Sequence, residues 1–356
     1  MNDYYRQYCL PERKDDNMRE IRVEEAIGTV LAHDMTRIVP GRFKGVQFKK
    51  GHVIRHEDIP VLLKMGKKHL YVMEKTPEQL HEDDAARRIA SALCWDNLKW
   101  TEPHEGKIKI TAATDGLLKI DVDALLSINS IGEIIVSTIK TGMPCKKDQV
   151  VAATRIIPLV IERRKIEQLE DIAGSSKAVL QILPYTKKLV GLVVTGSEVY
   201  EGLVKDESDR FIVSRLRDYG CELLRRIVVT DDAALIAAAI RELKEAGCEL
   251  ILTSGGLSVD PDDVTRKGVR ASGARIISYG CPVLPGGMFL NALLGDIPIL
   301  GLPACVFFNP RTVYDLMLPK ILAGEQPTVE EVAAMGHGGM CMECEVCHFP
   351  VCPYGR

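Results

Sequence analysis

Residues 248–265, CELILTSGGLSVDPDDVT, hold the side chains whose types and spacing are best suited to chemistry. The apolar run 250–252 predicts a buried strand, and Gly255 and Gly256 allow the backbone to come close to a ligand. Three carboxylates follow at the mouth of an expected helix. Because carboxylates alone would repel a phosphate, oxygen ligands beside backbone N–H groups indicate an anionic ligand bridged by Mg²⁺.

The same carboxylates also fit a purely structural role. Asp260 is a good N-cap, Pro261 is a good first helical residue, and Asp262 and Asp263 favour the positive end of a helix dipole. The residues alone therefore leave helix capping and ligand binding both open.

The composition bounds the class of protein. A chain of 356 residues with 46% hydrophobic and 27% charged residues can form two or three folded domains. A net charge of −3, without a long basic block, argues against a nucleic-acid partner. No apolar stretch is long enough to span a bilayer, and the amino terminus lacks the hydrophobic core of a signal peptide, so we expect a cytoplasmic protein.

The pattern along the chain predicts five parts. They are a mobile leader (1–18), a small mixed α/β unit (19–78), a β-rich middle domain (79–176), an α/β domain (177–330) and a cysteine-rich tail (331–356). Helical spacing predicts helices over 23–31, 58–66, 83–93 and 159–173 in the first half of the chain. Short apolar runs separated by Gly, Pro, Asp and Lys predict the strands of the middle domain.

From residue 179 onward, strands and helices alternate at short intervals. Strands are expected over 189–195, 222–229, 249–253 and 297–302, Asp232 is expected to cap a helix over 234–246, and a closing helix is expected over 306–322. Such alternation predicts a parallel sheet covered on both faces, with ligands bound at the carboxyl ends of its strands. Both TGSE at 195–198 and SGG at 254–256 fall at such ends.

Several motifs in order resemble the molybdopterin-binding domain shared by MogA, MoeA and the gephyrin proteins. They are TGSEVYEG, KDESDRF, the TDD before a helix, LTSGGLSVDPDDVT and GLPACVFFNPRTVYDLMLPKILAG, and together they cover residues 179–324. The resemblance implies a three-layer α/β domain that binds the dithiolene pterin, or its adenylylated form, at the strand ends. It also implies a homodimer.

The resemblance assigns candidate roles residue by residue. The candidate contacts with the pterin or its phosphate are Thr195, Gly196, Ser197, Glu198, Ser208, Ser254, Gly255, Gly256, Ser258, Asp260 and Pro303. Asp206 and Asp263 are the candidate catalytic carboxylates, and together with Asp260 they would handle Mg²⁺ or molybdate.

The amino-terminal segments RVEEAIGTVLAHDMT and FKKGHVI are similar to the MoeA branch, in which molybdate is inserted into the pterin dithiolene and AMP is released. We therefore expect a function in molybdenum cofactor biosynthesis, as a molybdopterin molybdotransferase-like enzyme. GLPAC at 301–305 replaces the GLPGNP-like loop of that branch, and its DGYA segment is missing. This keeps a non-catalytic molybdopterin carrier or sensor open, and SVDPDDVT is also similar to the CinA-like branch, which is linked to nucleotide hydrolysis.

Four of the eleven cysteines gather near the end of the chain. Cys341, Cys344, Cys347 and Cys352 are separated by two, two and four residues, with His348 beside the third. Four soft ligands at this spacing predict bound zinc or an iron–sulfur cluster. The other seven cysteines are scattered singly, as is typical of buried free thiols.

Overall fold

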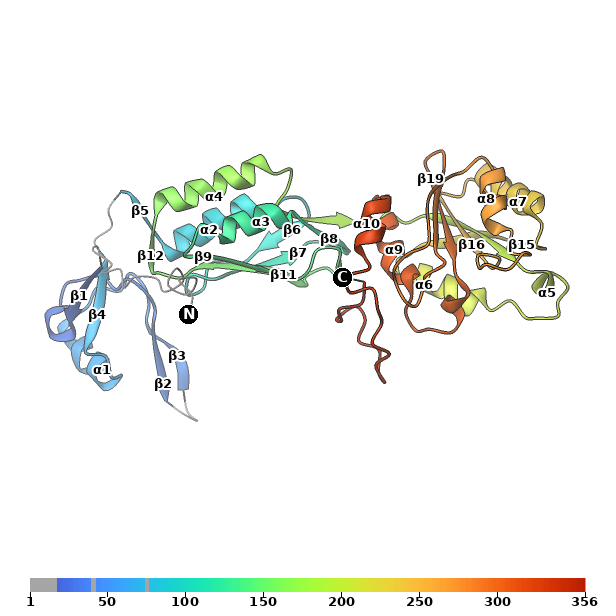
Figure 1. Ribbon diagram of the computed structural model, residues 1–356. Coiled ribbons are helices and arrows are strands. Elements are labelled where there is room, and N and C mark those ends of the chain that lie inside the picture. The colour runs from blue at the N-terminus through green and yellow to red at the C-terminus, as the bar shows by residue number, and fades with distance from the viewer. Residues whose placement is uncertain (1–17, 40–42, 74–76, 356) are drawn as a thin grey trace, which may run out of the picture.

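The computed structural model describes residues 18–39, 43–73 and 77–355, and in this part of the chain three folded units follow one another (Figure 1). Buried apolar residues form one core between residues 21 and 70, a second between 80 and 182, and two clusters on either side of a sheet between 190 and 354. The expected mobile leader lies outside the described residues except for Met18. Within the described ranges, no helix is both long and apolar enough to cross a bilayer.

The amino-terminal unit consists of two antiparallel strand pairs and short helices. Its elements are β1 (Met18–Arg22), η2 (Val23–Glu25), β2 (Met35–Val39), β3 (Phe43–Phe48), η3 (His56–Asp58), α1 (Ile59–Lys64) and β4 (His69–Met73). Strand β1 pairs with β4, and β2 pairs with β3. The helix expected over 23–31 is wrong: only the turn η2 forms, and Gly28 soon adopts φ of 83°, which a right-handed helix does not permit.

The helices of the middle unit lie on one face of its β-sheets (Figure 1). Its elements are β5 (Gln79–His81), α2 (Glu82–Leu93), β6 (Leu98–Trp100), β7 (Ile108–Ala112), β8 (Gly116–Ile120), α3 (Val122–Asn129), β9 (Ile134–Thr138), β10 (Pro144–Cys145), β11 (Val150–Ile156), β12 (Val160–Glu162), α4 (Arg163–Ser175) and β13 (Leu180–Pro184). The strands form sheets in the orders β6-β7-β11-β9, β10-β8-β13 and β12-β5. The expected helix over 159–173 begins only at Arg163, because the preceding residues pair with β5 as strand β12.

The carboxy-terminal unit is the α/β domain that carries the candidate site. Its elements are β14 (Leu189–Thr195), α5 (Ser197–Tyr200), η4 (Asp209–Val213), α6 (Ser214–Arg217), β15 (Glu222–Val229), α7 (Ala233–Glu245), β16 (Leu250–Ser254), α8 (Thr265–Ala271), β17 (Arg275–Tyr279), β18 (Leu290–Leu294), β19 (Ile297–Leu302), η5 (Ala304–Phe307), α9 (Val313–Leu322) and α10 (Val329–Ala334). The sheet order is β15-β14-β16-β19-β18-β17. The first four strands are parallel, and β18 and β17 extend the sheet in antiparallel fashion.

Alternate residues of the central strands face opposite layers. Val193 and Ile251 pack with α7 and α8, whereas Leu192 and Leu252 belong to the cluster built by α6 and α9. The expected α/β class with three layers is therefore confirmed. The closing helix expected over 306–322 is interrupted, because α9 starts only at Val313 behind a capping box formed by Thr312 and Asp315.

Asp232 is the N-cap of helix α7, as the sequence predicts. Asp232 accepts hydrogen bonds from the backbone N–H groups of Ala234 (2.7 Å) and Leu235 (3.1 Å), as an N-cap should. Replacing Asp232 with Ala should lower the free energy of unfolding by about 1 kcal/mol, whereas Asp232→Asn should retain most of it. Scanning calorimetry of the three proteins checks this, and equal losses in both variants would contradict the capping role.

Candidate ligand-binding site

The carboxyl ends of β14 and β16 lie side by side and are joined by buried hydroxyls. The Thr195 hydroxyl, in a residue only 4% exposed, donates to the Ser254 carbonyl at 3.2 Å. The Thr265 hydroxyl donates to the Gly255 carbonyl at 2.9 Å, and the two threonine oxygens lie 3.2 Å apart. These contacts fix the turn after β16 against β14 and the start of α8.

The two glycines after β16 are required by this contact. Gly255 has φ of 96°, and a Cβ atom there would clash with the Thr195 carbonyl oxygen. Gly256 has φ of 58°, and its Cβ would lie 2.5 Å from the Thr265 hydroxyl. Both positions combine a left-handed backbone with a close approach that only glycine allows. The glycines therefore serve the packing of the strand ends.

A cavity of about 540 Å³ opens at these strand ends. Three segments form its wall: the turn after β16, the loop before β18 and the residues after β19. The lining residues are Gly255, Gly256, Leu257, Ser258, Asp263, Leu284, Pro285, Gly286, Gly287, Met288, Leu302, Pro303, Ala304 and Cys305. Mostly apolar walls with a few polar groups are typical of small-molecule sites of this size.

Asp263 is the carboxylate that lines this cavity. The turn before α8 closes on itself: Asp263 N donates to the Asp260 carbonyl (3.0 Å), and Asp260 N donates to the Asp263 carboxylate (3.3 Å). Helix α8 starts at Thr265 with Val264 at its N-cap and no side-chain cap. The capping role considered for Asp260 is therefore wrong. Residues 260–263, which we call the acidic turn, instead hold Asp263 at the cavity wall.

Cys305 contributes a neutral thiol to the same cavity. Burial raises the pKa of this thiol, and a backbone hydrogen bond and the charge of Arg215 offset only part of that effect. An ordinary cysteine is already mostly protonated at neutral pH, so Cys305 is a thiol there and not a thiolate.

The TGSE segment lies beside the cavity without lining it. Ser197 donates from its backbone N (2.8 Å) and its hydroxyl (3.0 Å) to Asp231, and Glu198 is exposed on α5. Gly196 adopts φ of 141° between β14 and α5. Asp231 is a residue that the motif analysis missed, although the TDD motif contains it.

Asp206 and Ser208 form a separate ion-paired group. The Asp206 carboxylate accepts from the backbone N (2.8 Å) and hydroxyl (3.0 Å) of Ser208 and pairs with Arg226 of β15 at 3.1 Å. Arg226 also binds Asp209 at 2.8 Å. The charge of Asp206 is therefore already balanced, and this residue is not part of the cavity wall.

The structure thus places five of the predicted site residues on the cavity wall and the others away from it. The cavity wall includes Gly255, Gly256, Ser258, Asp263 and Pro303. Thr195 and Ser254 are buried at the strand ends, while Asp260 is exposed on the acidic turn. The turn residues of PGG at 285–287 fit either a loop that closes over a ligand or a plain surface connection, and the structure places this loop on the cavity wall. The sequence motifs did not assign Cys305 to the site.

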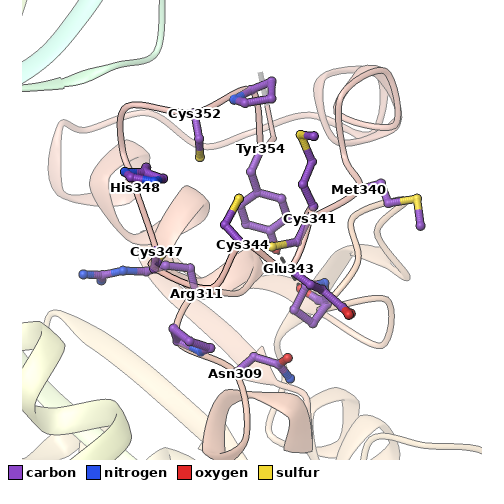
Figure 2. Close-up of a pocket in the computed structure, with 14 residues that line it drawn as sticks. Asn309, Arg311, Met340, Cys341, Glu343, Cys344, Cys347, His348, Cys352 and Tyr354 are labelled. Atoms are coloured by element: carbon purple, nitrogen blue, oxygen red, sulfur yellow. Dashed lines mark hydrogen bonds between the residues drawn. The ribbon is translucent and has the colours of Figure 1, made fainter.

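The cysteine tail lines a second cavity, which is next to the first. Cys341, Cys344, Cys347 and Cys352 all line this space of about 380 Å³, together with His348 (Figure 2). All ten cysteines in the described ranges are free, and none of those ranges contains three His, Cys, Asp or Glu side chains already placed around an ion.

Comparison with known families identifies two parts of the chain. Residues 191–322 match the family model described as "Probable molybdopterin binding domain". Residues 191–322 are a domain of the molybdopterin-binding family. The resemblance inferred from the motifs is therefore confirmed for this segment, which contains all residues of the cavity wall. Residues 20–74 match a model that describes a domain of unknown function.

Curated relatives extend the resemblance to CinA-like proteins. The CinA-like protein of Mycobacterium tuberculosis is 43% identical over 75 residues, which is 21% of this chain and 17% of that protein. The CinA-like protein of Mycobacterium leprae is 41% identical over 75 residues, covering 21% and 18% of the two chains. The matched region is thus less than a fifth of each relative.

Solved structures with similarity to the chain include two small proteins. CinA from Thermoplasma acidophilum is 22% identical and covers 34% of this chain and 90% of its own, with a TM-score of 0.30. The molybdopterin biosynthesis enzyme MoaB from Thermus thermophilus is 18% identical and covers 39% and 99%, with a TM-score of 0.32.

The close approach at Gly255 leads to a testable difference between two glycines. Gly255→Ala should be destabilised both by its left-handed backbone and by the clash with Thr195. Gly247→Ala, at φ of 89° with open space around it, should be destabilised by its backbone conformation alone. We expect a loss of about 1 kcal/mol for Gly247→Ala and about 1–3 kcal/mol more for Gly255→Ala. Thermal unfolding measures both, and equal losses would show that the strand ends tolerate a side chain.

Proposed function

We propose that the cavity at the strand ends binds molybdopterin, free or adenylylated, and that the protein inserts molybdate in a molybdotransferase-like step of molybdenum cofactor biosynthesis. One observation carries this proposal: the segment that matches the molybdopterin-binding family folds so that a glycine turn, a carboxylate and an apolar wall meet around one cavity. The size of the cavity suits a small organic ligand.

The wall of the cavity suggests how a phosphorylated pterin would lie. Leu257, Met288 and Pro303 supply apolar surface for a flat ring. Gly255 and Gly256 line the same wall, and the space that their Cβ atoms would fill is taken by Thr195 and Thr265. In this proposal the ring packs on the apolar residues while the phosphate faces the glycine turn.

Asp263 is the residue that we propose to bind Mg²⁺ or to orient molybdate. Its carboxylate is held by the acidic turn and lies on the cavity wall. A bound Mg²⁺ would offset its charge and bridge to an anionic ligand. Asp206 would have to break its ion pair with Arg226 before it could bind Mg²⁺ or molybdate, so we assign this role to Asp263.

Two alternatives make different chemical demands on the same cavity. A carrier or sensor needs pterin binding without molybdate insertion, which the replaced GLPGNP-like loop favours. A nucleotide hydrolase is favoured by the identity shared with CinA-like proteins. A homodimer, and zinc or an iron–sulfur cluster in the tail, are further proposals that this chemistry does not require.

Substitution of one carboxylate at a time tests the proposed step. Asp263→Asn should reduce molybdate insertion into adenylylated molybdopterin at least about tenfold, because a loss of ~1.4 kcal/mol in transition-state stabilisation has that effect. Pterin binding should change much less. Asp262→Asn is the matched control, because Asp262 is exposed on the same turn and does not line the cavity.

Each outcome of this assay favours a different function. Insertion is measured as molybdate-dependent release of AMP, and binding is measured by ultrafiltration of the pterin. Wild-type binding without AMP release would favour the carrier, and turnover of pyridine nucleotides or ADP-ribose without pterin binding would favour the CinA-like alternative. Equal insertion rates in the Asp263 and Asp262 variants would remove Asp263 from the chemistry.

A further inference from the structure

The end of the described chain forms a loop that closes beside its own start. Gly355 N donates to the Gly338 carbonyl at 2.8 Å. Cys341, near the beginning of the same segment, donates from its backbone N to the Leu284 carbonyl at 2.8 Å. We call residues 338–355 the cysteine loop.

Both ends of the cysteine loop are packed into the α/β domain. Tyr354 is 3% exposed, and its hydroxyl donates to the Pro285 carbonyl at 2.8 Å. Gly355 adopts φ of 68°, and a side chain there would clash with Leu316 of α9. Gly339 is equally confined, because its Cβ would lie 2.6 Å from the Met335 carbonyl oxygen. Both ends of the cysteine loop are therefore held in place by close packing and hydrogen bonds to the α/β domain.

The middle of the cysteine loop is exposed over residues 342–348, whereas Phe349 packs against the core of the α/β domain. Residues 341–353 form no helix or strand, and a backbone hydrogen bond joins Val351 N to the His348 carbonyl at 2.7 Å. Cys344 and Cys347 are exposed, whereas Cys341 and Cys352 are half-buried at the base. A segment of this kind gains a fixed shape when a cross-link or a metal joins its side chains.

The cavity that the four thiols line has suitable chemistry for a metal centre. In Figure 2 the Cys344 and Cys352 side chains reach into the same space, whereas the Arg311 side chain points away from them and pairs with Asp315 at 2.8 Å. Arg311 also stacks 5.3 Å from the Phe349 ring centroid. The charge of Arg311 is balanced by Asp315, and the Glu343 carboxylate lies on the same wall, so the bound metal itself would have to offset the negative charge of the four thiolates.

The cysteine loop also holds the loop that lines the ligand cavity. Leu284 uses both of its backbone groups for this contact: its N donates to the Gly339 carbonyl (2.7 Å), and its carbonyl accepts from Cys341 N. Pro285 lines both cavities. Anything that fixes the cysteine loop therefore acts on one wall of the ligand cavity.

We propose that Cys341, Cys344, Cys347 and Cys352 bind one thiophilic metal centre, zinc or an iron–sulfur cluster, and that this centre fixes the ligand-cavity loop 284–288 through Leu284. Each thiol releases its proton when it becomes a ligand, and a cluster would be assembled from inorganic sulfide and equal amounts of ferrous and ferric iron, so that no further oxidant or reductant is needed. Because the described side chains do not yet surround a common point, binding must draw the two exposed thiols inward. The second half of the proposal rests on the proposed function of the ligand cavity; the first half does not.

The metal centre is tested on the full chain purified without oxygen. The variant is Cys344→Ser combined with Cys347→Ser, because both residues are exposed and their replacement leaves the packed ends intact. Cys94→Ser, a half-buried thiol of the middle unit, is the matched control. We expect about one zinc ion per chain, or about four iron and four sulfide with a brown colour, in the wild type and the control but not in the variant.

Two results would contradict the proposed metal centre or its ligands. After reconstitution with zinc, and separately with iron and sulfide, wild-type protein that holds no metal and whose thiols react with thiol reagents as fast as before reconstitution would contradict the proposal. Retention of full metal content by the double variant would contradict the assigned ligands.

Amide hydrogen exchange tests the link to the ligand cavity without requiring the pterin. The amides of Leu284 and Cys341 should exchange at least about tenfold more slowly in the metal-loaded wild type than in the double variant, because their hydrogen bonds open with the cysteine loop. Equal exchange rates would break the link while leaving the metal centre in place. Metal-dependent protection in a protein that fails to bind pterin would instead overturn the proposed function and leave the tail centre standing.

Discussion

The candidate site depends on one buried contact, where the ends of two parallel strands are held together. Thr195 at the end of β14 donates to the carbonyl at the end of β16, and Gly255 leaves room for this approach because it has no side chain. Thr265 joins the start of α8 to the same point. The acidic turn between β16 and α8 has its two ends fixed in this way, and so Asp263 has a defined place at the cavity. A ligand site built on strand ends gains its geometry from the sheet and not from the loops themselves.

The opposite wall of the cavity is positioned from another direction. Gly286 packs so closely on α9 that a Cβ would lie 2.6 Å from the Cβ of Val313, and Pro285 accepts hydrogen bonds from Val313 N (3.2 Å) and Tyr354. Helix α9 and the cysteine loop thus hold the same short segment from two sides. The ligand cavity and the cysteine cavity are neighbours that share this wall, which connects the molybdopterin-binding family fold with the added tail.

The parallel core could be predicted from sequence because its determinants are local. Apolar runs mark β14, β16 and β19, Asp232 caps α7, and Gly247 ends it at φ of 89°. The turn residues PGG at 285–287 left a ligand loop and a plain surface connection both open, because loop 284–288 reaches the site only when β17 and β18 extend the sheet in antiparallel fashion. The acidic turn was ambiguous for a related reason: only the position of the first residue of α8, Thr265, separates a cap from a cavity residue. Asp206 matched its motif, but the motif does not contain Arg226 of β15, the partner that balances its charge.

The most direct test of the central claim is hydrogen exchange of the full chain with and without molybdopterin. If the ligand sits at the joined strand ends, amides in residues 255–263 and in residues 284–288 should both become protected, while the middle unit is unchanged. Protection confined to another part of the chain, or no protection at saturating pterin, would contradict the account.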